Sequence, residues 1–561
     1  MEQKYKWRKL DIETTVFILF LIGMAVYYGW RMFALTPWYD ELYTYYYFIS
    51  RGPVYAAIHW PLPNNHIGYS VLSACLGIFG NAAIALRGVS FLCSLGSLIL
   101  LFCIGRKCFD RGLALIPVFC YTGMKLVNQL AVQGRGYALV TFCYLTAIYE
   151  LLHIVTLGKV TVRRYAVFGI SLLLALYAIP SSVYVVVPVC MIGGVILLLR
   201  REYRRLLHLI LTSLISAVCT AGLYSIVWLA IGSNLLAKTE SSAYYGMGHM
   251  SILMHAPFKA LKTGIDYMLA TPYIQSVDRE GFLGQLADWL HRLLNEYYAG
   301  GAAVLAVLLI VSVILVCASI VAKLKNGSYL KSITEEKSAE ESKILNHDFI
   351  EIYLAGSILC IPAMLIIQCA LPYYRVFSFA GVTVAFAVTW LWQMMVRGVA
   401  KLSESAGKNK AAEPGQRRVK PEKYIPVAGS LICGIFCVFK LLTPSYMAEY
   451  SYREAAIADA YKHADTRMAT TIAVTDCDQE YLLLFLYGIG EERVTRQPEE
   501  GDIVLADKYL LLGYTRRDDL SGDVWKLYVT PEQFGASNVQ EQMEAVYENS
   551  RFILYKHKEN E

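Results

Sequence analysis

The run AAVLAVLLIVSVILVCASIVA at residues 302–322 decides the fold, because none of its side chains carries a charge. A helix of about 20 apolar residues is long enough to cross the roughly 30 Å hydrocarbon core of a membrane. Similar runs recur along the 561-residue chain, in which 56% of residues are hydrophobic and only 17% are charged. The sequence therefore predicts a protein that crosses a membrane many times.

Eleven spans are predicted, and all of them are helical because lipid offers the backbone no other hydrogen-bond partner. The apolar segment 68–79 is only about three turns long, so it is predicted to be a helix lying in or near the membrane interface. Together these elements form an all-α membrane domain over residues 1–444. The spans lie near residues 14–30, 85–104, 112–128, 136–156, 165–179, 182–199, 206–230, 302–322, 350–370, 376–396 and 425–442.

Basic residues are distributed unevenly between the predicted loops. The turns at 129–134 and 180–181 carry no Lys or Arg. Because cytoplasmic loops carry the excess of Lys and Arg, the N-terminus is predicted to be cytoplasmic, and loops 31–67 and 232–300 and the C-terminal segment to be extracytoplasmic. A bacterial plasma membrane suits this arrangement. The basic segments are the N-terminus before the first span, Arg106-Lys107, Lys159 with Arg163-Arg164, Arg200-Arg201, 323–349 and 397–424.

Hydropathy falls after residue 444, and residues 445–561 are predicted to form a small soluble α/β domain outside the membrane. Strand-like runs occur at 471–475, 502–506, 524–529 and 552–555, and helical patterns near 447–463 and 532–547. The domain has 12 Lys and Arg against 22 Asp and Glu. This acidic balance argues against a nucleic-acid partner. Asp476-Cys477-Asp478 matches the D-x-D pattern of some metal-dependent sugar transferases, but an ordinary acidic turn is the favoured interpretation on this side of a membrane.

Three polar motifs fall on the predicted external side, although they are far apart in sequence. They are Asp40-Glu41 after the first span, Gln133-Gly134-Arg135-Gly136-Tyr137 after the third, and Pro372-Tyr373-Tyr374-Arg375 after the ninth. Packing alone gives no reason for a carboxylate and two arginines to gather on one face of a membrane protein. Their convergence predicts a site for an anionic substrate.

The residue types in these motifs suggest a division of roles. Asp40 in a partly dehydrated site would be a competent general base for an acceptor hydroxyl, although a solvated loop acid is the simpler interpretation of that residue alone. The guanidinium groups of Arg135 and Arg375 can each bind two phosphate oxygens, or can instead lie at helix ends with their charges in water. Asn64-Asn65-His66 adds two amides and an imidazole that suit sugar hydroxyls or phosphates. Tyr137 and Tyr374 belong to the same motifs.

The arrangement resembles the GT-C superfamily of integral-membrane glycosyltransferases, which includes protein O-mannosyltransferases and bacterial aminoarabinose transferases. The resemblance covers roughly residues 14–200 and rests on Asp40-Glu41, on Asn64-Asn65-His66, on the segment from Asn81 to Arg106, and on the motif from Gln133 to Tyr137. It implies a membrane enzyme that transfers a sugar from a polyprenyl-phosphate carrier to an extracytoplasmic acceptor, usually with inversion.

Carried over by position, the resemblance makes Asp40 the base that deprotonates the acceptor. Glu41 and His66 would orient donor or acceptor, while Arg135 and Arg375 would bind the carrier phosphate. No cofactor is required on this interpretation, and a divalent metal is left open. The expected partners are the lipid-linked sugar donor, membrane lipids, and an acceptor that is a cell-wall polymer, glycolipid, polysaccharide or protein.

Two other classes of function fit part of the sequence. A flippase or transporter of lipid-linked saccharides would also have many spans and phosphate-binding arginines, but such proteins place their polar residues near the membrane midplane and often contain repeats. A noncatalytic membrane scaffold would use its acidic external domain to bind a partner, and Asp40 would then be dispensable.

Overall fold

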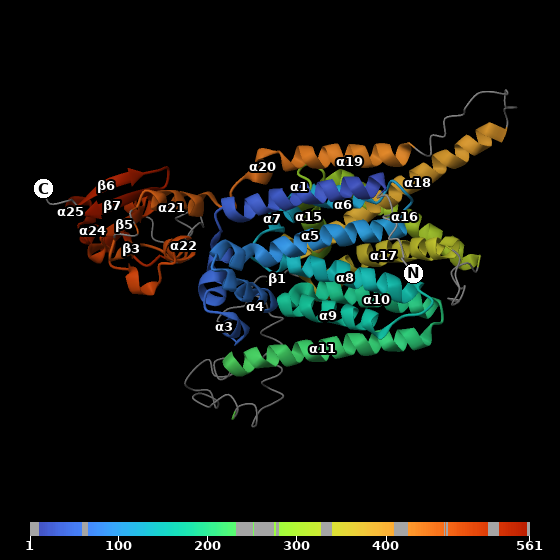
Figure 1. Ribbon diagram of the computed structural model, residues 1–561, viewed down its shortest axis with the longest axis horizontal. Helices are drawn as coiled ribbons and strands as arrows, with labels where there is room; N and C mark the ends of the chain where they lie inside the picture. The colour runs from blue at the N-terminus through green and yellow to red at the C-terminus, as the bar shows by residue number, and fades with distance from the viewer. Residues whose placement is uncertain are drawn as a thin grey trace, which may run out of the picture.

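The chain forms a bundle of long helices, with a small sheet at its C-terminal end (Figure 1). The computed structural model describes residues 11–58, 65–231, 251, 274–276, 280–326, 339–408, 424–464, 466, 469–513 and 527–557. The helices of the bundle are α1 (Ile12–Ala34), α5 (Ala82–Cys108), α6 (Leu115–Thr122), α7 (Lys125–Leu130), α8 (Tyr137–Thr156), α9 (Val162–Ala178), α10 (Val183–Leu199), α11 (Tyr203–Ile231), α15 (Phe282–Tyr297), α16 (Ala302–Lys325), α17 (Ala339–Gln368), α18 (Gly381–Lys408) and α19 (Ile425–Leu441).

Within the described ranges, eight helices are long and apolar enough to cross a membrane. They are α1, α5, α8, α10 with the preceding turn η3 (Pro180–Ser182), α11, α16, α17, and α18 with the preceding turn η5 (Tyr374–Ala380). Three other predicted spans are shorter: α9 and α19 have 17 residues each, and the run at 112–128 is divided between α6 and α7 at Gly123. The multi-pass helical architecture is confirmed, and the count of eleven spans stays a prediction.

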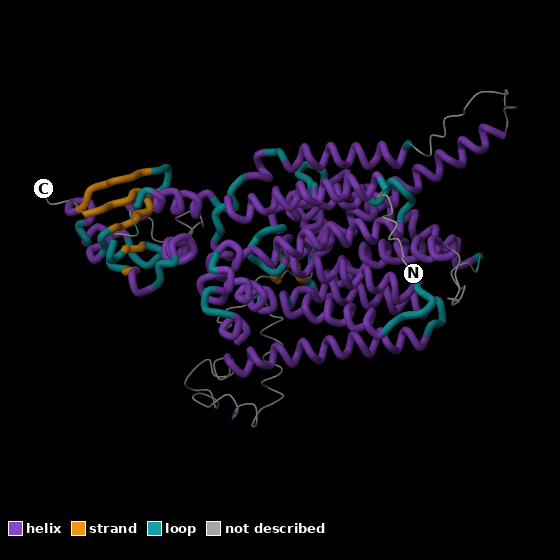
Figure 2. Tube along the Cα trace, viewed as in Figure 1, coloured by secondary structure: helices purple, strands orange, loops and turns teal. Residues whose placement is uncertain are grey.

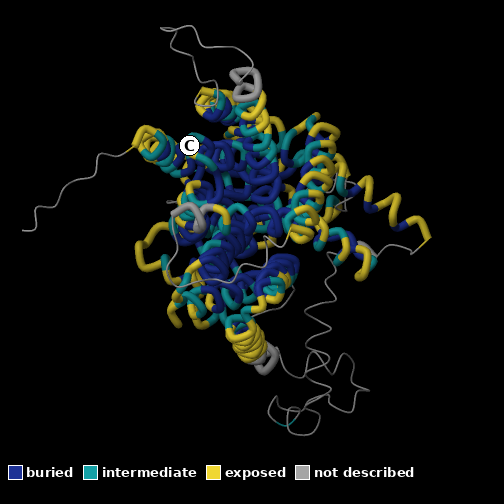
Figure 3. Tube along the Cα trace, turned by 90° about the vertical axis from the view of Figure 1, so that its right-hand side faces the viewer, coloured by how far each residue is buried: buried dark blue, intermediate teal, exposed yellow. Residues whose placement is uncertain are grey.

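The bundle has a protein core and an apolar exterior. In α8, 83% of the apolar stretch is buried, whereas only 17% is buried in α1, α11 and α16. Figure 3 shows buried segments at the centre of the bundle and exposed ones around it. Large exposed apolar side chains such as Ile215 and Ile314 lie on the outer helices. An exposed apolar surface of this extent suits contact with lipid rather than with water.

The chain between α1 and α5 is folded into short helices at one end of the bundle. These are α2 (Tyr39–Thr44), the π-helix η1 (Tyr45–Ile49), α3 (Pro53–Ile58), α4 (Ile67–Leu76) and the turn η2 (Gly77–Phe79). The predicted short helix at 68–79 therefore corresponds to α4 and η2. A two-stranded ladder joins β1 (Ile274–Ser276) to β2 (Ala370–Pro372) in antiparallel register.

The C-terminal region contains a five-stranded mixed sheet in the order β4-β3-β5-β7-β6 (Figure 2). Its strands are β3 (Ile472–Val474), β4 (Val494–Thr495), β5 (Ile503–Asp507), β6 (Met543–Glu548) and β7 (Phe552–His557), and its helices are α20 (Pro444–Met447), α21 (Tyr452–Lys462), α22 (Cys477–Tyr487), α23 (Lys508–Leu511), α24 (Pro531–Ala536) and α25 (Val539–Gln542), with short turns η7 (Glu491–Arg493) and η8 (Pro498–Glu500). β3 is parallel to β4 and β5, whereas β7 is antiparallel to β5 and β6. The predicted α/β class of this region is confirmed.

One helix predicted in the C-terminal region is wrong at its end. The pattern at 532–547 was expected to be a single helix, but the structure has α24 and α25 followed by strand β6. Residues 543–548 pair with β7 and complete the edge of the sheet. Pairing with a strand that follows in sequence outweighs the local helical preference. The predicted strand at 524–529 lies mostly outside the described residues, and Leu527 makes only an isolated bridge to Asp476.

Candidate active site

The predicted site residues come together at the end of the bundle that carries the C-terminal region. Asp40 is the second residue of α2, His66 immediately precedes α4, Arg135 lies in the turn before α8, and Arg375 lies in η5. These four elements are separated by up to about 335 residues of sequence. The polar cluster is thus built from four segments that only the fold brings together.

Asp40 forms an ion pair with Arg375 at the rim of this cluster. Arg375 Nη1 donates to Asp40 Oδ2 at 2.9 Å. The side chains remain 14% and 26% exposed, so the pair is accessible from outside the protein. The guanidinium group also lies over the rings of Trp38 and Tyr373, with its carbon 5.5 and 5.0 Å from the two ring centres. Contact with aromatic faces stabilises a cation and restricts where Arg375 can lie.

Arg135 links α2 to the start of α4 from a buried position. Its Nη1 atom donates to Thr44 Oγ1 at 2.7 Å and approaches the Asp40 carbonyl at 3.4 Å. Its Nη2 atom is 3.2 Å from His66 Nε2. Only 2% of Arg135 is exposed. A buried cation therefore lies next to the helix that carries Asp40.

His66 contacts the turn that carries Arg135. The Gly136 N–H donates to His66 Nδ1 at 2.9 Å, and the Tyr137 ring contacts the imidazole edge-on at a centre distance of 5.3 Å. Burial, together with the nearby Arg135 and Arg375 cations, lowers the pKa of His66 well below its usual value. The imidazole is therefore neutral at physiological pH and can serve as a hydrogen-bonding group without adding charge.

Glu41, the residue after Asp40 in α2, is fully buried. Arg87 donates to both of its oxygens, from Nε at 2.7 Å and from Nη2 at 2.8 Å, and the Gly134 N–H donates to Oε1 at 2.6 Å. Arg87 Nη1 also donates to the carbonyls of Met32 and Leu35. Both oxygens of Glu41 are thus engaged inside the protein. The geometry suits fixing α2 and the Arg135 turn better than contact with a substrate.

Sequence reasoning did not select Arg87 as a site residue, although a signal was present. Arg87 lies on the second turn of α5, inside an otherwise apolar span. A charged residue in such a position needs a partner and is usually functional. Asp40 and Glu41 are two carboxylates at the same end of the bundle as Arg87. In the structure Glu41 pairs with Arg87, and Asp40 pairs with Arg375.

The remaining predicted residues are placed around the cluster. Asn65 is buried and joins α3 to α4, because its Nδ2 donates to the Ala56 carbonyl at 3.0 Å and its Oδ1 accepts from Ser70 at 2.7 Å. Tyr374 contacts Trp289 of α15, with ring centres 5.7 Å apart. Trp289 Nε1 in turn donates to the carbonyl of Pro372, the last residue of β2. Asn64 lies outside the described residues.

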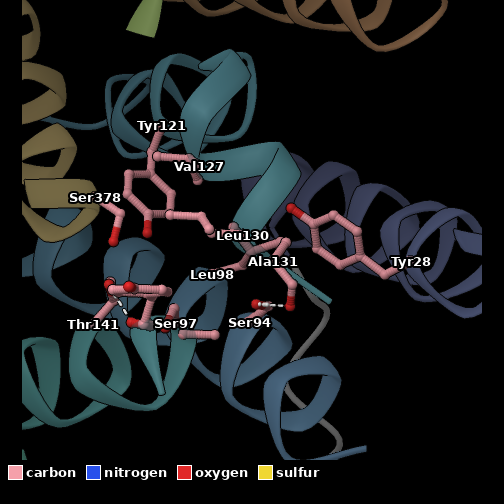
Figure 4. A pocket seen from close by; sticks show the side chains of 12 residues that line it. Tyr28, Ser94, Ser97, Leu98, Tyr121, Val127, Leu130, Ala131, Thr141 and Ser378 are labelled. Atoms are coloured by element: carbon pink, nitrogen blue, oxygen red, sulfur yellow. Dashed lines mark hydrogen bonds between the residues drawn. The ribbon is translucent and has the colours of Figure 1, made fainter. Parts of the chain in front are cut away.

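A small cavity lined by hydroxyl groups lies below the cluster, inside the bundle (Figure 4). Its volume is about 10 Å³, which is room for about one water molecule. A sugar ring does not fit in a cavity of this size, so the cavity itself is not a sugar-binding site. The hydroxyl-bearing residues that line it are Tyr28, Ser94, Ser97, Tyr121, Tyr137, Thr141 and Ser378.

Two groups of acidic residues elsewhere have the composition of metal sites, but basic side chains bind them. Asp476 and Asp478 of the D-x-D sequence bind the buried Arg453 at 2.5 and 2.7 Å. Asp476 also caps α22 by accepting the N–H groups of Asp478 and Gln479. This geometry supports the interpretation of the D-x-D sequence as a structural turn.

The second group lies on α17, where His347, Asp348 and Glu351 place their ligand atoms within 4.8 Å of one another. The Lys323 ammonium donates to Asp348 Oδ1 at 2.8 Å and to Glu351 Oε2 at 2.6 Å. A cation of the protein itself thus lies between the two carboxylates. Both groups are explained as ion-pair networks. The expectation that no cofactor is required, with a divalent metal left open, stays a prediction.

One family model matches a segment in the first half of the chain. Residues 67–228 match the family model for dolichyl-phosphate-mannose-protein mannosyltransferase. This segment contains α4, the helix that directly follows His66, together with Arg87 and the turn that carries Arg135. A search of curated protein sequences finds no match.

Among solved structures, the chain is similar to ArnT from Cupriavidus metallidurans in the apo state, with 12% identity, a TM-score of 0.49, and coverage of 97% of this chain and 98% of that one. It is also similar to ArnT from the same organism bound to undecaprenyl phosphate, with 14% identity, a TM-score of 0.45, and coverage of 96% and 98%. The chain is also similar to AglB from Archaeoglobus fulgidus, in complex with an inhibitory peptide and a dolichol-phosphate. The identity is 11%, the TM-score is 0.47, and the match covers 98% of this chain and 75% of that one. The family match over residues 67–228 confirms the predicted resemblance of this chain to the GT-C superfamily of membrane glycosyltransferases.

Proposed function

We propose that this protein transfers a sugar from a polyprenyl-phosphate carrier to an acceptor hydroxyl outside the cytoplasm, with Asp40 as general base. The observation that carries the proposal is the accessible Asp40–Arg375 pair with the buried Arg135 beside it. A base and two phosphate-binding cations are the groups that this reaction needs at one place. The family match over residues 67–228 favours the same class of reaction.

The charge of the cluster suits an anionic carrier. Arg135 and Arg375 contribute two positive charges and Asp40 one negative charge, while Glu41 and Arg87 neutralise each other. With His66 neutral, the cluster carries a net charge of +1. A carrier phosphodiester brings one negative charge, so its binding leaves the site neutral. Charge balance of this kind reduces the cost of burying a phosphate.

In the proposed reaction the acceptor oxygen attacks the anomeric carbon as its proton passes to Asp40. The bond between that carbon and the phosphate oxygen breaks, and the electron pair leaves on polyprenyl phosphate. Arg135 and Arg375 stabilise the charge that develops on the leaving phosphate. Attack opposite to the leaving group inverts the anomeric centre. The residues named here complete these steps without a metal or cofactor.

The distribution of charged residues supports an extracytoplasmic site. α5 carries Arg87 near the cluster and Arg106 at its opposite end, where Arg106 binds Asp11 and Glu13. Arg164, Lys323 and Arg397 are paired with Glu150, Glu351 and Asp110 in the predicted cytoplasmic loops or the helix ends beside them. The basic residues of the loops at that end support a cytoplasmic location for it, and the cluster lies at the other end.

The test is turnover of radiolabelled polyprenyl-phosphate sugars by the purified protein in liposomes, with Arg135→Ala and the exposed Arg204→Ala as a matched pair. We expect release of polyprenyl phosphate from at least one donor. Arg135→Ala should weaken donor binding roughly ten- to a hundredfold because it removes charged hydrogen bonds, whereas Arg204→Ala should bind normally. Movement of an intact lipid-linked saccharide across the membrane without cleavage would favour a flippase instead.

A further inference from the structure

The helix that carries Asp40 is attached to the C-terminal region through a different face from the one that contacts Arg135. Asp40 and Thr44 are one helical turn apart, and both contact Arg135. Tyr39 and Tyr43 are also one turn apart, on a different face of the helix, since residues four apart share a face. The Tyr43 ring contacts Tyr481 of α22, with centres 6.3 Å apart.

The start of α2 is held by two carboxylates from the C-terminal region. The Tyr39 N–H donates to Glu454 Oε1 at 2.9 Å, one residue before Asp40. The Thr36 N–H, in the segment that leads into α2, donates to Glu449 Oε2 at 2.8 Å. Glu454 is itself buried and is bonded by Ser451. Each of these bonds fixes backbone, so each acts on the position of the helix rather than on one side chain.

The far end of the same segment is held by a second pair of carboxylates. The Tyr46 hydroxyl lies 2.6 Å from Glu480 Oε1 and 2.8 Å from Glu491 Oε1. Glu480 is held in turn by the Tyr528 hydroxyl at 2.6 Å. The Tyr46 ring also contacts the Tyr481 ring at a centre distance of 4.5 Å. Tyr46 belongs to the π-helix η1, a helix type that is frequent at functional sites.

The parts of the C-terminal region that hold α2 are joined to one another by a buried ion-pair network. Arg453, next to Glu454 on α21, binds Asp476, Asp478 and Asp507 from the sheet and α22. Asp507 also binds Arg551 at 2.8 Å. The network ties α21, which carries Glu454, and α22, which carries Glu480, to the end of β5.

We propose that the C-terminal region positions the active site, with Glu454 and Tyr46 as positioning residues that set where Asp40 lies. This rests on the proposed function for its activity readout. Arg375 reaches Asp40 from the bundle, while the C-terminal region holds both ends of the segment that bears it. Misplacing a reacting group by about 1 Å can reduce a rate roughly a hundredfold, so these contacts affect turnover more than donor binding.

The experiment compares Glu454→Ala, Glu454→Gln and Tyr46→Phe in the full-length protein, with Glu499→Ala as an exposed acidic control in the same region. Glu454→Ala should lower kcat roughly ten- to a hundredfold and leave the donor KM within about twofold. Glu454→Gln keeps an oxygen that accepts the Tyr39 N–H and should recover most of kcat. Tyr46→Phe should lower kcat in the same way, and Glu499→Ala should match the wild type.

Hydrogen exchange at the amides of α2 gives a second measurement that needs no substrate. Glu454→Ala should speed exchange at Tyr39–Thr44 relative to Glu499→Ala. If Glu454→Ala does not fold, Tyr46→Phe decides by the same two measurements. Unchanged exchange and unchanged kcat in the folded variant would overturn the positioning role. Faster exchange in a protein with no transferase activity would uphold the attachment of α2 and count against the proposed function instead.

Discussion

Glu41 and Asp40 are neighbours in sequence, yet the fold gives them different environments. Glu41 is fully buried, with Arg87 on both of its oxygens, whereas Asp40 is partly exposed and paired with Arg375. The pair of acids is visible in the sequence, but their separation is not, because it depends on which side of α2 faces α5. A helix of six residues gives too short a pattern for that decision.

Loss of Arg87 should destabilise the protein because it leaves Glu41 as an uncompensated buried charge. We expect Arg87→Leu to reduce the free energy of unfolding by about 3–5 kcal/mol. The double variant with Glu41→Leu should recover much of that loss. Unfolding in detergent measures both, with Arg292→Ala in an exposed ion pair as the control. Equal stability of Arg87→Leu and Arg292→Ala would contradict the role given to this pair.

His66 should make stability fall in acid. Its pKa is lowered in the folded protein, whereas the unfolded chain has the usual value of about 6.5. As the pH falls below about 6.5, the unfolded chain binds a proton that the folded protein does not, so the free energy of unfolding decreases. His66→Asn keeps an acceptor for the Gly136 N–H and removes the titration. The melting temperature between pH 7.5 and 5 should therefore fall less in His66→Asn, and parallel curves would refute this account.

At the scale of elements, the turn from Ala131 to Gly136 is only partly predictable from its sequence. Its Gly-Arg-Gly sequence indicates a close approach of backbone to another group, and the Gly134 N–H does approach Glu41 at 2.6 Å. The identity of that group was not predictable, since the sequence suggested a ligand. The strand β6 was missed because its pairing with β7, which the sequence did predict as a strand, is known only from the folded sheet.

Adding a methyl group at Gly134 should disturb this turn. A Cβ there would lie 2.5 Å from Leu86 Cδ1 and 3.1 Å from Glu41 Oε1. Gly134→Ala should therefore displace Arg135, weaken donor binding at least about tenfold and cost about 1–3 kcal/mol of stability. Gly29→Ala adds its methyl where no atom lies within 4 Å and is the control. Donor titration of both variants checks this, and equal affinities would count against a tightly packed turn.

At the scale of the whole molecule, the helical bundle follows from hydropathy alone, because apolar runs of this length have few other folds available. The exact number of crossings does not follow, since α9 and α19 are near the limit of length and the run at 112–128 breaks at Gly123. The attachment of the C-terminal region to α2 also lies beyond sequence reasoning. It depends on contacts such as Tyr46 with Glu480, which are 434 residues apart.

The proposed orientation predicts which end of the protein is reached from outside the cell. Gln542→Cys, an exposed position beside β6, should react with a membrane-impermeant maleimide in intact cells. Lys401→Cys, exposed near the end of α18, should react only after the membrane is opened. Labelling of the wild type, which has fourteen native cysteines, gives the background. The reverse pattern would place the cluster on the cytoplasmic side.

The central claim is that Asp40 acts in catalysis while the arginines bind the donor, and one paired measurement tests it. Donor binding and single-turnover transfer are measured on the same preparations of wild type and Asp40→Asn in lipid. We expect Asp40→Asn to bind the donor within a fewfold of wild type and to lose roughly 10² to 10⁴ of the transfer rate, the usual contribution of a general base. Full transfer by Asp40→Asn would contradict the account.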